Sequence, residues 1–199
     1  VMPWCMRCGT TLSQHELVGT DTYQEMLHTA VTLQFPLTGR TNEFLLVWTT
    51  TPWTLAGNVA CAVNPELLYV KAKVDGNIYF LSQQTIADVL PIGHEVLAEI
   101  PGSELVGLAY RGPWDELPAQ TGIEHRVVGW ADVSEEEGTG IVHIAPGSGI
   151  DDFALGQKEG LPVVKPIDGE GRYIDGFGPL VGLNALTATD LILDSLTKK

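Results

Sequence analysis

Apolar and polar residues alternate along the first half of the chain with the period of β-strands. In AVTLQFPL (30–37), Val31, Leu33 and Phe35 would face a core, and Pro36 closes the run. Val74-Asp75-Gly76-Asn77, between two alternating runs, predicts a tight hairpin. The further predicted strands are EFLLVW (43–48), VACAV (59–63), LLYVKAKV (67–74), NIYFL (77–81), EVLAEI (95–100), HRVVGWADV (125–133) and GIVHIA (140–145).

Helical patterns are fewer. SQQTIADVL (82–90) predicts a short helix that stops at Pro91, and IDDFALGQKEG (150–160) predicts a helix that ends at Gly160. After it, LPVVKPI (161–167) is expected to return to a strand. NALTATDLILDSLTKK (184–199) predicts an amphipathic helix with a capping box from Thr187 and Asp190. Many short strands with few helices predict an α+β, mainly β fold, with a β-barrel core decorated by a few α-helices.

Composition limits the class of protein. The 199 residues are 44% hydrophobic and 18% charged, enough apolar material for a packed core. No apolar run approaches 18 residues and no signal peptide opens the chain, so we expect no membrane segment. The start at Val1 suggests a piece of a longer polypeptide. A net charge of −14 argues against a broad phosphate-binding surface but leaves room for one nucleic-acid end held in a pocket.

Cys5 and Cys8 in WCMRCGT have the spacing of half a zinc ribbon, which needs four ligands. Three interpretations stay open: half a site completed outside this chain, a leftover turn, or a redox pair. Cys61, in an apolar run, is expected to be a small core residue.

The usual catalytic motifs are missing from the sequence: there is no GxSxG, HExxH, P-loop or GxGxxG. Two unusual stretches remain, WTTTPWTLAGN (48–58) and EEGTGIVHIAPGSGIDDF (136–153). Each residue has an ordinary structural explanation by itself. Threonines favour strand ends, acidic residues favour the first turn of a helix, and a strand histidine is often a core residue.

Taken together, WTTTPWTLAGN…AVNP and GTGIVHIAPGSGIDDFALGQKEGLP closely resemble the two signature stretches of the editing domain of isoleucyl-tRNA synthetase. The opening PWCMRCGTTLSQHE…FPL resembles the segment that leads into that domain, so the resemblance covers residues 3–183. Valyl and leucyl editing domains typically have an arginine where Pro52-Trp53 stands here, which favours the isoleucyl branch. The resemblance implies a connecting segment (1–20), an editing barrel (21–183) and a helix leading back to the parent enzyme (184–199).

The resemblance also implies an activity: hydrolysis of mischarged Val-tRNA(Ile), with valyl-adenylate as a second expected substrate. Asp152 matches the family's ammonium-binding aspartate. Asp151 beside it could cap the helix equally well, and we expect it, with Trp48, to be among the substrate-binding residues. Thr49, Thr50 and Thr51 match the threonine-rich strand end that lines the pocket, next to Trp48. His143 matches the histidine beside the substrate side chain, and Asn58 an asparagine that binds substrate or braces the loop. A positioned water would attack while threonine donors orient the carbonyl.

Several expectations accompany this hypothesis. Editing itself would need no cofactor; ATP would serve only the parent's synthetic site, and zinc would bind only in the parent. The expected partners are the 3′-terminal aminoacyl-adenosine of tRNA(Ile) and the parent's other domains, in a cytoplasmic, monomeric protein. Three alternatives stay open: a valyl-type editing domain that removes threonine, a non-catalytic module that binds the tRNA 3′ end, and a structural β-barrel of a larger enzyme in which both stretches only pack.

Overall fold

The computed structural model of the chain describes residues 3–5, 7–18, 29–136 and 138–198. The strands found in this part of the chain are β1 (Trp4–Cys5), β2 (Thr10–Thr11), β3 (Val31–Pro36), β4 (Glu43–Thr49), β5 (Ala60–Val63), β6 (Leu68–Val74), β7 (Asn77–Ser82), β8 (Glu95–Pro101), β9 (Arg126–Gly129) and β10 (Val142–Ile144). The α-helices are α1 (Gln14–Leu17), α2 (Ile86–Val89), α3 (Ile150–Glu159) and α4 (Thr189–Thr197). Short 3₁₀ helices are η1 (Pro52–Gly57), η2 (Gly102–Glu104), η3 (Pro118–Gln120), η4 (Gly178–Leu180) and η5 (Ala185–Thr187).

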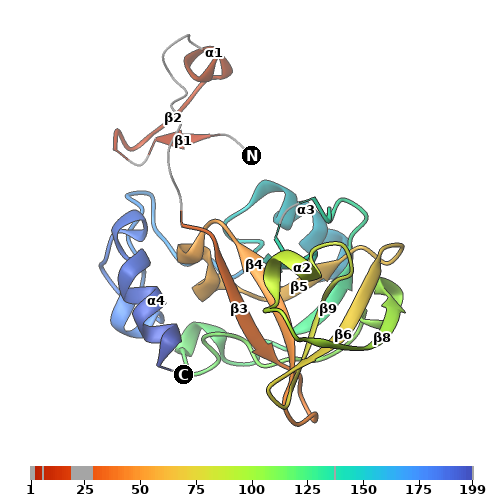
Figure 1. Cartoon of the computed structure of the whole chain (residues 1–199). Helices are drawn as coiled ribbons and strands as arrows, with labels where there is room; N and C mark the ends of the chain where they lie inside the picture. The colour runs from red at the N-terminus through yellow and green to blue at the C-terminus, as the bar shows by residue number, and fades with distance from the viewer. Residues whose placement is uncertain (1–2, 6, 19–28, 137, 199) are drawn as a thin grey trace.

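The main sheet curls, and a segment outside the named strands connects β9 to the residues that follow β3. Its strand order is β8-β6-β7-β4-β10-β5-β9, with β3 paired to the other edge of β4. Residues 107–111 close the ring: Val127 N donates to Leu108 O on one side, and Thr38 N donates to Ala109 O on the other. The predicted barrel core is therefore confirmed, and Figure 1 shows its strands with α4 at one side and α3 at the other.

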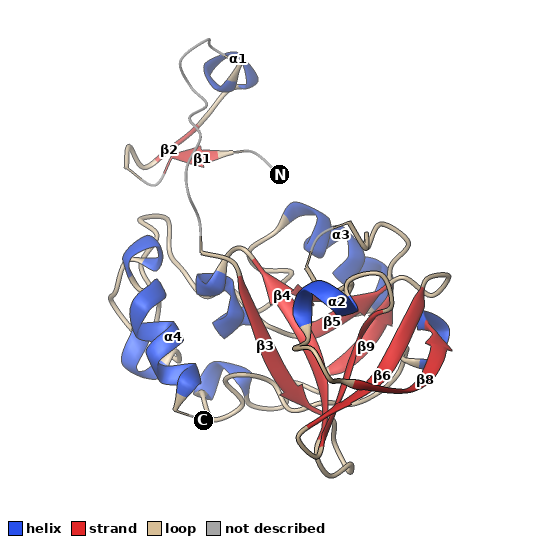
Figure 2. Ribbon diagram, viewed as in Figure 1, coloured by secondary structure: helices blue, strands red, loops and turns tan. Residues whose placement is uncertain are grey.

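Side-chain alternation divides each strand between the barrel interior and an outer layer. On β5, Cys61 and Val63 belong to the interior core, whereas Ala60 and Ala62 pack outside with Leu155 of α3. A third cluster lies between β4, β6, β7 and the short helix α2. Figure 2 shows α3 and α2 at the periphery of the sheet, where they pack on these outer clusters.

The two unusual stretches leave the sheet at the same edge. β4 and β10 are parallel neighbours, with Val142 paired to Trp48. The carboxyl ends of parallel neighbours meet at one edge, so the loop after Thr49 and the loop after Ile144 start side by side. Glycines permit the close packing there, because a Cβ at Gly138 would clash with the Trp48 indole.

Two local predictions are wrong. Residues 161–167 form no strand, apart from a single bridge between Ile167 and Tyr173. Pro162 and Pro166 lack the N–H groups that a sheet ladder needs, and the segment instead packs on Gly57 and Gly147.

The expected capping box is the second error. The N-cap of α4 is Ala188, whose side chain makes no capping bond. Thr187 Oγ1 donates instead to Asn184 O at 3.1 Å, and Asn184 caps the preceding 3₁₀ helix. The helical pattern therefore begins one turn earlier than α4 itself.

Within the described residues, none of the helices has the length and apolar character needed to cross a membrane.

Candidate functional site

The threonine run begins inside the barrel and ends outside it. Thr49 is buried on the interior side of β4, while Thr50 and Thr51 are exposed where the chain turns into η1. Thr51 N donates to Thr49 Oγ1 at 3.1 Å, which closes the turn after the strand. The two hydroxyls lie 3.4 Å apart. Adjacent threonines therefore shape the turn and line the strand end with hydroxyl groups.

His143 connects this threonine cluster to the barrel interior. It stands on β10 opposite Cys61 of β5, so both side chains point inward. Its Nε2 lies 2.7 Å from Thr54 Oγ1, and its Nδ1 lies 3.1 Å from Asn58 Nδ2. Thr54 in turn lies 3.3 Å from Thr51 Oγ1. His143, Asn58 and Thr54 are all buried, so one continuous polar network lies at the carboxyl ends of β4 and β10.

Burial determines the charge state of His143. The side chain is removed from water without a facing carboxylate, which lowers its pKa to about 4. The imidazole is therefore neutral at physiological pH. Both of its nitrogens are engaged by protein groups, so His143 fits a bracing or wall-forming role and not that of a proton acceptor.

Asp152 lies in the first turn of α3 and is half-buried. Its Oδ2 accepts a hydrogen bond from Ala145 N at 2.7 Å, two residues beyond His143. Burial raises the pKa of Asp152, while the Ala145 N–H works in the opposite direction. One carboxylate oxygen thus ties α3 to the end of β10, and a carboxylate has further lone pairs for a cationic ligand.

Two predicted binding residues lie apart from this network. Trp48 alternates with Thr49 on β4, so its side chain faces the outside of the barrel, where Gly138 packs on it. Asp151 is exposed on α3, and the helix N-cap Gly149 receives no side-chain capping bond. Asp152, by contrast, is anchored, so the two neighbouring aspartates differ in their surroundings.

Cys5 and Cys8 lie in a β1–β2 hairpin. Cys8 N donates to Cys5 Sγ at 3.3 Å, and this N–H lowers the pKa of Cys5. A tight turn with a backbone donor to a thiolate fits half of a zinc site. Among the described residues, no group of three or more His, Cys, Asp or Glu side chains is placed to hold a metal ion. Zinc on this hairpin therefore stays a proposal that needs ligands from elsewhere.

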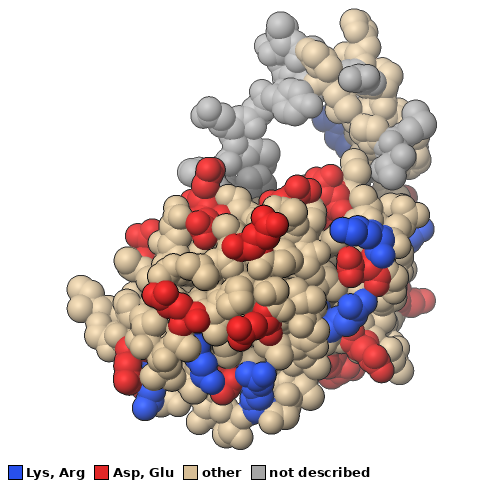
Figure 3. Space-filling view, turned by 90° about the vertical axis from the view of Figure 1, so that its right-hand side faces the viewer, with Lys and Arg blue, Asp and Glu red and all other residues tan. Residues whose placement is uncertain are grey.

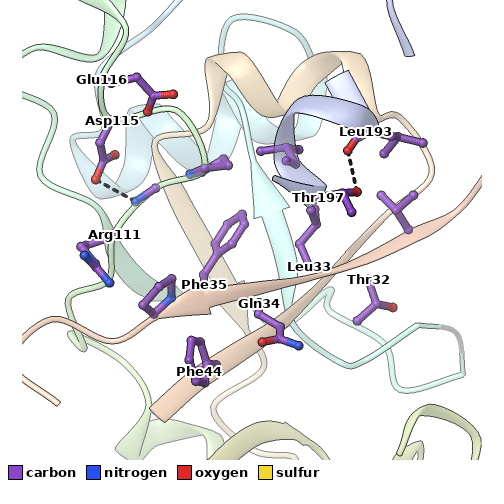
Figure 4. A pocket seen from close by; sticks show the side chains of 15 residues that line it. Thr32, Leu33, Gln34, Phe35, Phe44, Arg111, Asp115, Glu116, Leu193 and Thr197 are labelled. Carbon is purple, nitrogen blue, oxygen red and sulfur yellow. Dashed lines mark hydrogen bonds between the residues drawn. The ribbon is translucent and has the colours of Figure 1, made fainter. Parts of the chain in front are cut away.

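A large cavity elsewhere on the domain contains none of the predicted site residues. It has a volume of about 880 Å³ and lies between β3, the loop 111–116 and the end of α4. Figure 4 shows Leu33 and Phe35 of β3 facing Leu193 and Thr197 of α4 across it. This cavity runs along β3 from Val31 to Pro36, and none of the residues of the His143 network lines it.

Charged side chains are interspersed on the surface. On the described part of the face in Figure 3, acidic and basic residues lie next to one another, and no continuous basic band crosses it. This agrees with the overall charge of −14 and with recognition of a small chemical group more than of a long phosphate backbone.

Comparison with known proteins gives the family of this chain. An isoleucine–tRNA ligase of Methanothermobacter marburgensis is 40% identical over the whole chain, and that of Pyrococcus furiosus is 42% identical over 88% of it. The chain spans about a fifth of the length of these relatives, 19% and 18%. No family model matches.

Solved structures with the same fold are editing domains. The CP1 domain of a leucyl-tRNA synthetase, GlLeuRS-CP1, superposes with a TM-score of 0.66 at 16% identity, covering 85% of this chain and 96% of that one. The editing domain of the Plasmodium knowlesi (P. knowlesi) cytosolic leucyl-tRNA synthetase gives 0.62 at 13% identity, over 86% and 94%.

The fold is therefore that of a synthetase editing domain, as the sequence predicted. The chain itself belongs to the isoleucine–tRNA ligase family, of which it is the editing-domain segment.

Sequence reasoning missed two members of the network, Thr54 and Tyr110. Tyr110 donates from its hydroxyl to Asn58 Oδ1 at 2.8 Å. Thr54 was within reach, because it follows Thr51 by three residues in a stretch already singled out. Tyr110 lies 52 residues from Asn58 in an irregular loop, and no local pattern connects the two.

We expect His143 to make the domain less stable in acid. Its folded pKa of about 4 lies below the ordinary value of 6.5. Its contribution is therefore complete above pH 6.5 and is lost as the pH falls toward 4. Between pH 7 and pH 5 the loss should amount to about 2 kcal/mol. Urea unfolding of the wild type and of His143→Gln at both pH values measures it; an equal change with pH in the two proteins would contradict the buried neutral imidazole.

Proposed function

We propose that this domain hydrolyses the valyl ester on the 3′-terminal adenosine of tRNA(Ile), and valyl-adenylate as a second substrate. Membership of the isoleucine–tRNA ligase family and the editing-domain fold support the reaction class. The observation that carries the proposal is the position of Asp152. Its carboxylate is held by Ala145 N, at the same sheet edge as the threonine turn.

The parent enzyme's chemistry explains why such a site is needed. A synthetic pocket rejects a substrate that is smaller by one methylene only weakly, and isoleucine against valine is itself the standard example, at roughly 150-fold. A second site that admits only the smaller amino acid removes the errors. It requires an anion for the α-ammonium group and a rigid wall around the side chain.

The residues at the edge of the sheet match these requirements. Asp152 is partly desolvated, which strengthens its attraction for an ammonium group. Thr50 and Thr51 are β-branched and stiff at χ1, and His143 is held at both ring nitrogens. These side chains can form a wall that fits valine and excludes the extra methylene of isoleucine.

Hydrolysis then proceeds by attack of a positioned water on the ester carbonyl. His143 is neutral and already bonded on both sides, so we assign it no proton transfer. Orientation of the water and the ester supplies several kcal/mol, which suits an already activated ester. The acidic surface of the domain implies that the parent's remaining domains hold the body of the tRNA, in the cytoplasm where charging takes place.

Asp152→Asn should separate the charge of this residue from its structural bond. The amide keeps an oxygen to accept from Ala145 N, so stability at pH 7 should stay within about 1 kcal/mol of the wild type. Deacylation of Val-tRNA(Ile) should nevertheless fall roughly 100-fold in kcat/KM, because the ammonium loses its anion. Asp152→Ala should lose both stability and activity. Wild-type turnover in Asp152→Asn would refute the ammonium anchor.

Substitutions in the wall should relax specificity. Thr50→Ala and His143→Ala enlarge the space beside the substrate side chain, so hydrolysis of Ile-tRNA(Ile) should rise by about tenfold or more. Thr41→Ala, an exposed threonine on the loop between β3 and β4, is the matched control. Deacylation rates with Val-, Ile- and Thr-charged tRNA measure the specificity of each variant. Full discrimination in both variants would contradict the size wall, and preference for Thr-tRNA would favour a valyl-type domain.

A further inference from the structure

We propose that Tyr110 is a positioning residue that, together with the carbonyl oxygens of Ala60 and Thr51, fixes the direction of the hydrogen bonds in the buried network, so that the threonine cluster offers acceptors to a bound ligand. The inference builds on the proposed function, but its direct readout is independent of activity. The network runs from Tyr110 through Asn58 and His143 to Thr54.

Tyr110 is a fixed donor at the start of this network. It is 3% exposed, and its ring stacks on Phe35 with centroids 5.4 Å apart. Burial raises the pKa of its hydroxyl well above the ordinary value, so the proton stays in place. The Tyr110 hydroxyl also contacts the thiol of Cys61. Burial raises the pKa of this thiol to about 12. Neither group can ionise and reverse the bond to Asn58.

Asn58 transmits this direction, because both ends of its amide are assigned. Its Oδ1 accepts from Tyr110, and its Nδ2 donates to Ala60 O at 2.9 Å. The group that meets His143 Nδ1 is therefore an N–H donor, so Nδ1 must be the unprotonated nitrogen. The proton of the neutral ring then lies on Nε2.

Thr54 receives that proton's hydrogen bond. Its own hydroxyl hydrogen is used at 2.7 Å by Thr51 O. The hydroxyl oxygens of Thr54 and Thr51 lie 3.3 Å apart. Because the Thr54 proton is already used, Thr51 must be the donor in this contact. The hydroxyl oxygens of Thr51 and Thr49 lie 3.4 Å apart, and by the same reasoning Thr49 is the donor there. Each of these three hydroxyl protons is thus used in a hydrogen bond within the cluster.

The consequence differs from the sequence-based expectation that the threonines act as donors to the ester carbonyl. The hydroxyl protons of Thr49 and Thr51 are used in hydrogen bonds within the cluster, so these two hydroxyls present lone pairs to a ligand. Lone pairs match the hydrogens of an attacking water or of an α-ammonium group, and they repel a developing oxyanion. The threonine cluster is therefore suited to orient the nucleophile, and Tyr110 maintains that polarity from inside the barrel.

The test is the protonation of His143, read by imidazole ¹⁵N NMR on the uniformly labelled chain between pH 6 and pH 8. In the wild type, Nδ1 should be unprotonated and Nε2 protonated. In Tyr110→Phe, the Asn58 amide is oriented only by its bond to Ala60 O, so its orientation is less strongly fixed and the two ¹⁵N shifts should move toward each other as the other tautomer is populated. For deacylation of Val-tRNA(Ile), kcat should fall about fivefold to tenfold while KM changes less than about twofold.

Tyr69→Phe is the matched control. Tyr69 is also fully buried, and its hydroxyl bonds only reach backbone groups of Asn64 and Gly140. It should lose comparable stability and leave the His143 shifts unchanged. A protonated Nδ1 in the wild type would overturn the inference even if Tyr110→Phe failed to fold. The inference would also be overturned if a folded Tyr110→Phe variant kept the His143 ¹⁵N shifts and the kcat of the wild type. Absence of deacylation by the wild type would instead count against the proposed function, with the NMR result still deciding this inference.

Discussion

The arrangement depends on one buried, uncharged imidazole at the junction of two parallel strands. His143 is bonded through one nitrogen to the loop after β4 and through the other to Asn58, which follows η1. Protonation would place a charge in the barrel interior, where no carboxylate faces it. The two signature stretches therefore stay bonded to each other only while the His143 ring is neutral.

The fold supplies the setting in which this bond is useful. Parallel pairing of β4 and β10 brings two loops, about ninety residues apart in sequence, to the same edge of the sheet. The short bond from Ala145 N to Asp152 then fixes α3 to that edge. The carboxylate and the row of hydroxyls therefore lie together at one edge of the sheet, an arrangement that suits the proposed discrimination by size.

Strand patterns were sufficient to predict most of the barrel, because apolar and polar residues alternate in β3 and β5 is a short, continuous apolar run. They failed at residues 161–167, where apolar residues pack under the site as an irregular segment between two glycines. Local motifs singled out Thr49, His143 and Asp152, since each stands in a distinctive stretch, and the structure brings all three to one edge of the sheet. Trp48, from the same stretch, faces the outside of the barrel, because it alternates with Thr49 along β4. Tyr110 was beyond reach, because only the closed barrel brings residues 107–111 under Asn58.

The most direct test is a crystal structure of the domain with a non-hydrolysable 3′-valylamido analogue of adenosine. We expect the α-ammonium group to lie on the carboxylate of Asp152, and the valine side chain to lie between the threonine turn and His143. An analogue seated in the groove between β3 and α4, or an Asp152 carboxylate that contacts only Ala145 N with the ammonium elsewhere, would contradict this expectation.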